Sequence, residues 1–205
     1  SAPSGGASLG TASVTTAIVD DGTGGPPGTD DDRPVISIDD VTVNEGAGTA
    51  TFTVSLSNAS TSTTTVDYAT ADDTATDGGA VGAGDYDATS GTLTFNPGVT
   101  SQTITVAIND DNVYEISEGF FVNLSNATGG AVIGDGQGVG TIVDDGTGGP
   151  PGDNDIPSVS ITGPALVNEA AGTLTYTVSL SNPSDHPVTV DVATADGSAP
   201  AGSDY

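Results

Sequence analysis

The sequence predicts an all-β fold, built as tandem immunoglobulin-like antiparallel β-sandwiches joined by linkers rich in glycine and proline. Along several short segments apolar side chains alternate with polar ones, which is the period of a half-buried strand. Clusters of Gly, Asn, Asp, Ser and Pro separate these segments, and β-branched residues fill them. Motifs also recur at a fixed offset, as they do in repeat proteins. Many short strands of this kind are typical of sandwiches.

The expected strands follow from this alternation in chain order. The first covers residues 50–56, where Ala, Phe, Val and Leu alternate with Thr and Ser. The second contains VDYAT at residues 66–70, and the last contains GTIV at residues 140–143. Three strands between them carry an apolar residue at every second position: Leu93 and Phe95; Ile104, Val106 and Ile108; Phe120, Val122 and Leu124. One face of each strand is therefore expected to lie against a core.

Internal repetition sets the domain organisation. VDDGTGGPPG at residues 19–28 recurs at residues 143–152, and VNEG at residues 43–46 recurs as VNEA at residues 167–170, both at an offset of 124. FTVSLSN also returns as YTVSLSN at this offset. Repetition at one offset indicates copies of one structural unit.

Four segments are expected from this layout. Residues 1–28 are the C-terminal part of a preceding repeat with its linker, and residues 35–146 are a complete repeat. Residues 147–156 form a second linker, and residues 157–205 are the N-terminal part of a following repeat. The neighbouring repeats of the same chain are thus the first partners expected.

The charge is the second strong signal. The formal net charge is −27, from 24 Asp and 4 Glu against a single Arg, a single His and no Lys. Two carboxylates about 4 Å apart repel by about 4 kcal/mol at an effective dielectric near 20. Nucleic acid is excluded as a partner because its binding needs Lys and Arg. No apolar run approaches the length of a membrane span, so membrane insertion of this segment is not expected.

Acidic residues precede or follow several predicted strands, at positions where the loops of a sandwich gather at one pole. This set is Glu45, Asp72, Asp73, Asp110, Asp111, Glu115, Asp144 and Asp145. Oxygen ligands in flexible loops suit Ca²⁺, whereas Mg²⁺ keeps its waters and Zn²⁺ prefers His or Cys. Because Asp is also a common turn residue, the linker acids at residues 30–32 and 153–155 are left open between ligands and solvated turns.

Five motifs together resemble one family. In order and spacing, VNEG, DYATAD, GDYDATSGTLTFNPG, INDDNVYEISE and GTIVDDG resemble the Calx-beta domain. That family is a seven-stranded β-sandwich named from the cytosolic calcium sensors of sodium/calcium exchangers, and it also forms extracellular tandem arrays, including large bacterial adhesins. The resemblance therefore implies a β-sandwich with Ca²⁺ as its cofactor.

The resemblance also implies the metal ligands. They are Glu45, Asp72, Asp110, Asp111, Glu115, Asp144 and Asp145, with the backbone carbonyl of Val113. The terminal acidic run here has two acids before Gly146, and at least one calcium ion per repeat is expected. In the partial repeats only Asp20, Asp21, Glu169 and Asp196 match, so complete sites are not expected there.

Catalysis is not expected. The single histidine, His186, is the one candidate for a hydrolase triad, but it stands in a loop between Asp185 and Pro187 of an incomplete repeat and is expected to be a surface residue. The glycine-rich segment at residues 134–140 lacks the Lys of a P-loop and leads into a strand.

The function expected is a calcium-stabilised extender segment of a secreted, repetitive cell-surface protein of the adhesin type. One alternative is a subunit of an extracellular filament, in which strand exchange between copies of the chain completes each repeat. Another is a calcium-sensing regulatory module like that of the exchangers. The location expected is extracellular, at the cell surface.

Overall fold

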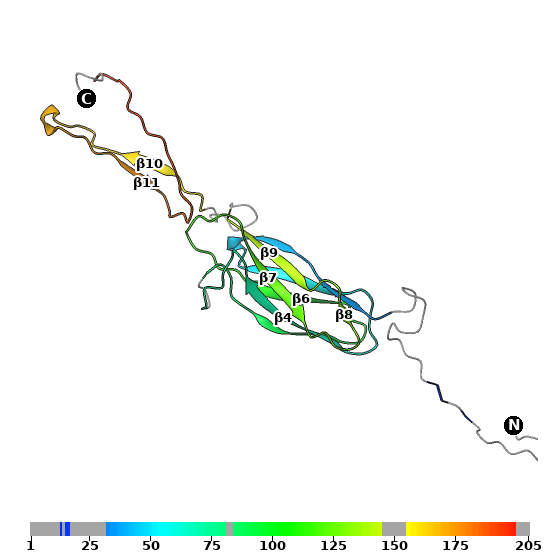
Figure 1. Cartoon of the computed structure of the whole chain (residues 1–205). Coiled ribbons are helices and arrows are strands. Elements are labelled where there is room, and N and C mark those ends of the chain that lie inside the picture. The colour runs from blue at the N-terminus through cyan, green and yellow to red at the C-terminus, as the bar shows by residue number, and fades with distance from the viewer. Residues whose placement is uncertain (1–12, 14, 17–31, 81–83, 145–154, 200–205) are drawn as a thin grey trace, which may run out of the picture.

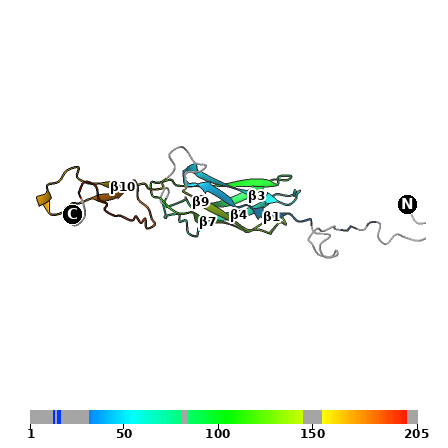
Figure 2. The ribbon, with the colours of Figure 1, turned by 90° about the horizontal axis from the view of Figure 1, so that it is seen from above.

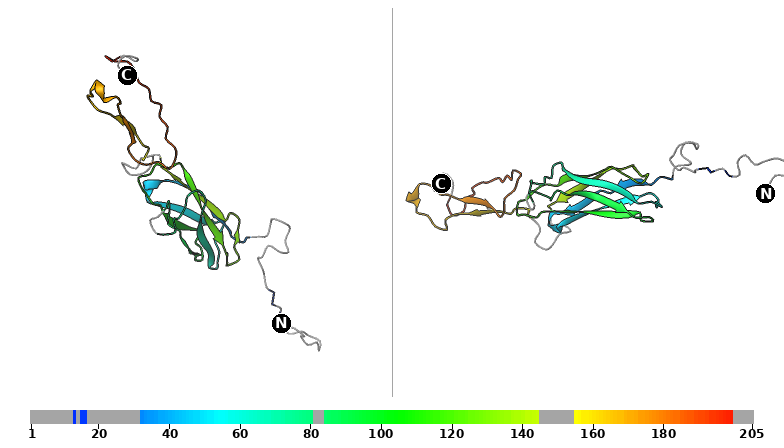
Figure 3. Two further views of the ribbon diagram at one scale, coloured as in Figure 1. Left: turned by 60° about the vertical axis from the view of Figure 1, so that its left-hand side comes forward. Right: turned by 90° about the horizontal axis from the view of Figure 1, so that it is seen from below.

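The structure, a computed structural model, describes residues 13, 15–16, 32–80, 84–144 and 155–199. A β-sandwich forms its central part, and a two-stranded hairpin continues beyond one end of that sandwich (Figure 1). Views from above and below show the hairpin lying along the long axis of the sandwich (Figures 2 and 3). The all-β prediction is confirmed, since the described helices are two single 3₁₀ turns.

The first sheet has four strands in the order β6-β3-β1-β8. Their bounds are β1 Val35–Ile38, β3 Thr49–Leu56, β6 Ser101–Ala107 and β8 Val132–Ile133. Strands β3 and β6 pair antiparallel over seven positions, with Phe52 opposite Ile104. The predicted alternation sets this register, because a slip by one residue would move the apolar residues to the solvent face.

The second sheet has five strands in the order β2-β9-β7-β4-β5. Their bounds are β2 Val41–Asn44, β4 Thr64–Asp72, β5 Ser90–Phe95, β7 Glu118–Ser125 and β9 Gln137–Val143. Strands β5, β4, β7 and β9 pair antiparallel with their neighbours. The strands end at two opposite poles, and the one near the hairpin carries the acidic loops considered below.

Two pairs of strands are parallel, which the sequence did not predict. Strand β1 pairs with β8, and β2 pairs with β9. Between β1 and β2 the chain crosses from one sheet to the other at Asp39 and Asp40. The side chain of Asp39 accepts a bond from Thr53 N at 2.6 Å, and that of Asp40 accepts one from Val139 N at 2.8 Å. These bonds satisfy strand N–H groups at the crossing.

The core lies between the two sheets. Every apolar residue of the predicted strands on β3, β6 and β7 is buried there, which confirms those strands. The ring of Tyr86 stacks on Phe120 with centroids 4.5 Å apart, and Phe52 meets Phe120 edge to face at 5.9 Å. A Cβ at Gly140 would lie 2.4 Å from the Phe120 ring, so only glycine lets this aromatic cluster close on β9.

Residues 155–199 begin as a copy of the sandwich. Strands β10 Val159–Thr162 and β11 Thr177–Leu180 pair with Val159 opposite Leu180, as Ile36 lies opposite Leu56 in the complete repeat. The short helices η1 Glu45–Ala47 and η2 Glu169–Ala171 also share an Asn cap and a left-handed Gly. Val159 and Leu180 are 44% and 40% exposed, because no second sheet covers the hairpin within the described residues.

Candidate metal centre

The acidic pole of the sandwich is the end at which η1, the loop after β6 and the end of β9 come together. Its carboxylates are Glu45 on η1, Asp85 before the Tyr86 bridge, Asp110, Asp111 and Glu115 after β6, Glu118 on β7, and Asp144 after β9. A depression at this pole is lined by Glu45, Asp85, Glu115, Ile116, Glu118, Ile142 and Asp144. Five of those seven side chains are acidic, and none is basic.

Glu45 is the most buried of these acids, at 5% exposure. Asn44 caps η1 by accepting a bond from Gly46 N, which directs the chain inward at this point. An oxygen of the Glu45 carboxylate accepts a bond from Asp111 N at 3.2 Å. Burial, then the charges of Asp111, Glu115 and Asp144, raise the pKa of Glu45 to about 8, against the lowering effect of that bond.

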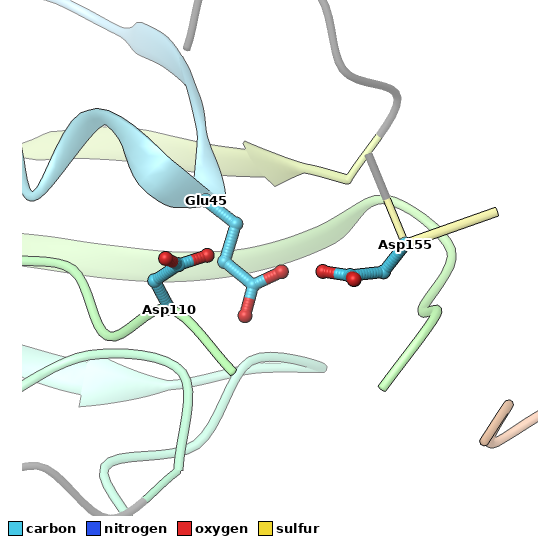
Figure 4. Close-up of side chains that lie close together, drawn as sticks. All are labelled: Glu45, Asp110 and Asp155. Carbon is cyan, nitrogen blue, oxygen red and sulfur yellow. The ribbon is translucent and has the colours of Figure 1, made fainter. Parts of the chain in front are cut away.

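Glu45, Asp110 and Asp155 form the first carboxylate cluster, with one oxygen of each within 4.8 Å of the others. Figure 4 shows the Glu45 side chain extending toward Asp155, with Asp110 beside it. Asp155 reaches the cluster from the other side, because it begins the unit that contains β10 and β11. Burial and the charges of Asp144, Asp110 and Asp111 raise the pKa of its side chain.

Asp85, Glu115 and Glu118 form the second cluster, again within 4.8 Å. Burial is the main cause that raises the pKa of Glu115 to about 7, followed by the charges of Asp85 and Asp111. Burial and the nearby Asp85 likewise raise the pKa of Glu118 to about 7. Asp85 is held by a bond that its carboxylate accepts from Thr76 N at 2.7 Å. Three carboxylates thus face one another without a cation of the chain between them.

Asp144 connects the two clusters. It is 7% exposed, and its carboxylate accepts bonds from Glu115 N at 3.1 Å and from Asp155 N at 3.4 Å. One oxygen therefore holds the loop after β6, and the other holds the start of the following unit. This arrangement makes the end of β9 the common support of both clusters.

The predicted ligands are distributed unevenly over this pole. Glu45, Asp110 and Glu115 belong to the clusters, and Asp144 lies between them. Asp111 instead turns back on its own loop, where its carboxylate accepts a bond from Val113 N at 2.6 Å.

Asp72 belongs to neither cluster. Its carboxylate accepts bonds from the Tyr86 hydroxyl at 2.7 Å and from Asp77 N at 3.1 Å. Ligation by Asp72, Asp111 and the Val113 carbonyl stays a prediction.

The remaining predicted residues lie in the partial repeats or in the terminal acidic run. Asp20, Asp21 and Asp145 lie outside the described residues, as does the side chain of Glu169 on η2. Asp196 is exposed and belongs to neither carboxylate cluster of the described chain.

Three cluster residues were missed by the sequence prediction. Glu118 lies within INDDNVYEISE but is not among the predicted ligands, and the sequence leaves Asp155 open between a ligand and a solvated turn residue. Asp85 stands in the motif GDY, which recurs as SDY, and that recurrence was the available signal.

The donor set fits a hard divalent cation. The side-chain donors of the two clusters are carboxylate oxygens, and they come from segments that differ in sequence position by up to 110 residues, from Glu45 to Asp155. Ca²⁺ takes six to eight such oxygens in flexible geometry, whereas Zn²⁺ would need His or Cys. A cation would also offset the burial and the repulsion that together raise the pKa values of Glu45, Glu115 and Glu118.

Comparison with known proteins finds similarity to the Calx-beta domain and to sodium/calcium exchangers. The model of the Calx-beta domain matches residues 29–146 and 153–205. The chain is similar to sodium/calcium exchanger 2 of Homo sapiens, with 34% identity over 152 residues, which is 74% of this chain and 14% of the exchanger. The corresponding exchanger of Rattus norvegicus is 36% identical over 127 residues, 62% of this chain and 12% of that protein. The chain thus matches only a small part of each exchanger.

A solved structure is also similar. The crystal structure of the apo-form Calx CBD1 domain matches with a TM-score of 0.50 and 27% identity, over 56% of this chain and 99% of that domain. The match supports the β-sandwich predicted from the strand pattern.

Proposed function

This chain belongs to the Calx-beta domain family, and on that premise we propose that it is a calcium-stabilised structural segment of a secreted, repetitive cell-surface protein of the adhesin type. The observation that carries the proposal is the acidic pole, where two carboxylate clusters meet without a Lys or Arg among their lining residues. Ca²⁺ is the cofactor that both the family and the donor set support.

The first cluster assigns Glu45, Asp110 and Asp155 as ligands, and the second assigns Asp85, Glu115 and Glu118. Asp144 supports both through the backbone N–H groups that it holds. Bound calcium neutralises these groups and joins segments that are distant in sequence. A ligand that binds only the folded state stabilises it by RT ln(1 + [Ca²⁺]/Kd), about 2.7 kcal/mol at a hundredfold excess over Kd.

The extender role rests on the arrangement of the units. The hairpin of the following unit continues along the long axis of the sandwich, as expected for units strung in line (Figures 1 and 3). Neighbouring repeats of the same chain are therefore the proposed partners. Secretion and a cell-surface location are proposed from the tandem repetition and its glycine- and proline-rich linkers. Among the described residues, no helix has the length and apolar character needed to cross a bilayer.

Two alternative functions have an observation in their favour. Similarity to the exchangers favours a calcium-sensing module. The exposed apolar side chains on β10 and β11 favour a filament whose strands are completed by another copy of the chain. Sedimentation at high protein concentration separates the filament from the extender, since an extender stays monomeric.

No catalytic role is proposed, and the single histidine, His186, has a 43% exposed side chain beside Asp185.

Thermal unfolding tests the proposal directly. The melting midpoint of the chain is expected to rise by several degrees in millimolar calcium relative to chelator, since a stabilisation of about 2–3 kcal/mol shifts the midpoint of a domain by that order. Equal concentrations of magnesium serve as the control and are expected to shift it much less. A midpoint that chelator leaves unchanged would refute the calcium role.

A further inference from the structure

The junction between the sandwich and the following unit contains main-chain pairing. Tyr114, in the loop after β6, forms a parallel bridge with Ser184. Tyr114 N donates to the carbonyl of Pro183 at 3.0 Å, and Asp185 N donates to the carbonyl of Tyr114 at 3.2 Å. The contact thus joins an acidic-pole loop of one repeat to residues 181–186 of the next, which we call the docking loop.

The docking loop also holds the start of its own unit. The side-chain amide of Asn182 donates to the carbonyl of Asp155, and Ser158 N donates to Ser181 Oγ at 2.9 Å. Asp155 is therefore fixed to the same loop that pairs with Tyr114. Its carboxylate enters the first cluster of the preceding repeat as part of this arrangement.

The complete repeat forms the same loop at its own N-terminal side. Asn58 Nδ2 donates to the carbonyl of Asp32 at 2.6 Å, and Val35 N donates to Ser57 Oγ at 2.9 Å. Ser60 Oγ accepts a bond from Ser62 N at 3.0 Å. In the docking loop Ser184 Oγ likewise accepts one from His186 N at 3.2 Å. The loop is thus built by each repeat itself, independently of the contact with Tyr114.

We propose that the acidic pole of each repeat is a docking surface for this loop of the following repeat, and that main-chain pairing with Tyr114 fixes the relative orientation of the two units. The partner recognised is another repeat in which Ser-Asn directly follows the strand equivalent to β3 and the third residue after the Asn has a backbone N–H. Residues 57–61, directly after β3, and residues 181–185, directly after β11, both meet this requirement.

The docking rests on the proposed function, because it carries two further carboxylates to the acidic pole. Asp155 lies in the first cluster, and the charge of Asp185 acts on Glu115 and Glu118 of the second. A bound cation offsets this repulsion, while the main-chain bonds specify the register. Calcium thus permits the contact, and the backbone of Tyr114 determines its geometry.

Distance measurement between two spin labels tests the docking. Because the chain has no Cys, Thr103→Cys on β6 and Thr177→Cys on β11 give one labelled pair at exposed positions. In calcium the unsubstituted docking loop is expected to give one narrow distance distribution. Asp185→Pro removes the N–H that donates to Tyr114 and is expected to at least double its width. Asp185→Asn keeps the N–H without the charge and is expected to stay narrow.

The outcomes separate the docking from the calcium role. The docking is overturned if the distance distribution of Asp185→Pro is as narrow as that of the original chain. It is also overturned if the distribution of Asp185→Asn is at least twice as broad as that of the original chain. The calcium-induced rise in melting midpoint is expected to persist in Asp185→Pro, and its absence from the original chain would contradict the proposed function alone. Amide exchange of the original chain adds a second readout: the Tyr114 amide is expected to exchange at least tenfold more slowly than that of Asn112, and equal rates overturn the docking.

Discussion

Glu45 shows how one residue sets the requirement for a cation. Its side chain is buried on a short helix, and its neighbours on the far side are Asp110 and Asp155 (Figure 4). A buried carboxylate without a positive partner is unfavourable, because burial and like charges both disfavour the ionised form. The same burial is favourable once a divalent ion lies among these oxygens. The ionised Glu45 side chain therefore lowers the stability of the folded chain without metal and raises it when metal is bound.

Glu45→Gln tests this double role, since it removes the charge and keeps the shape. In chelator at about pH 8.5, the free energy of unfolding is expected to rise by about 1–3 kcal/mol, because an ionised carboxylate with a pKa raised to about 8 is removed. The increase in the free energy of unfolding from chelator to calcium is expected to be smaller in Glu45→Gln than in the original chain, because one ligand has lost its charge. Urea unfolding in both buffers measures the two effects.

Asp135→Asn provides the matched control. Asp135 precedes β9, whose other end carries Asp144, so this substitution removes a charge at the opposite pole. Its effect is expected to stay within about 0.5 kcal/mol in either buffer. Equal effects of the two substitutions would show that net charge matters and the position of Glu45 does not.

At the scale of single elements, the packing of β7 against β9 depends on a glycine in β9. Gly140 faces the ring of Phe120, which also contacts Phe52 and Tyr86. A methyl group there would lie 2.4 Å from the ring, so the aromatic cluster would have to shift. Two aromatic contacts thus depend on one position of β9.

Gly140→Ala is accordingly expected to lower the free energy of unfolding by about 1–3 kcal/mol, as overpacking does in other cores. Gly119→Ala on β7 is the control, because its added methyl would lie 3.5 Å or more from every heavy atom beyond its two neighbours in the chain. Urea unfolding in saturating calcium compares the two. A smaller loss for Gly140→Ala than for Gly119→Ala would contradict this account of the cluster.

The strands with strict alternation were predictable, because the alternation within each short segment determines which of its side chains face the core. Phe52, Ile104 and Phe120 lie in the core as that pattern requires. Strands β1 and β2 were not predicted, nor was their parallel pairing with β8 and β9. Those pairings join residues about 100 positions apart, and a local period contains no information about such distances.

The candidate site was predictable in the same partial way. The acids at strand ends gave Glu45, Asp110, Glu115 and Asp144, because strand order brings those loops to one pole. Asp155 could not be selected from the sequence, because Asp is a common turn residue and the contact that brings it to the pole belongs to the following unit. Which carboxylates turn inward depends on local backbone bonds, such as that of Asp111 with Val113 N.

At the scale of the whole molecule, the acidic pole couples stability to pH. Glu45 has a pKa raised to about 8, and Glu115 and Glu118 have pKa values raised to about 7, from a usual value of 4.5. Between pH 4.5 and 8 the folded chain therefore binds more protons than the unfolded chain. By linkage, the free energy of unfolding falls as pH rises through this window.

Without metal, the chain is therefore expected to be more stable at about pH 5 than at about pH 8, by about 1–3 kcal/mol. Calcium binds the deprotonated carboxylates, so its stabilising effect is expected to increase over the same range. Urea unfolding at three pH values, in metal-free buffer and in calcium, measures both trends. Metal-free stability that rises with pH would show that these carboxylates do not dominate the titration.

The parallel pairing of β2 with β9 has a mechanical consequence. The chain enters the sandwich through β1 and β2 at its N-terminal side and leaves through β9. Tension applied between the two ends pulls these neighbouring strands in opposite directions along their length, so their hydrogen bonds are loaded in shear and must break together. A segment under stretch would resist extension at this pair, and the metal-binding loops that follow both strands would reinforce the point where the load is transferred.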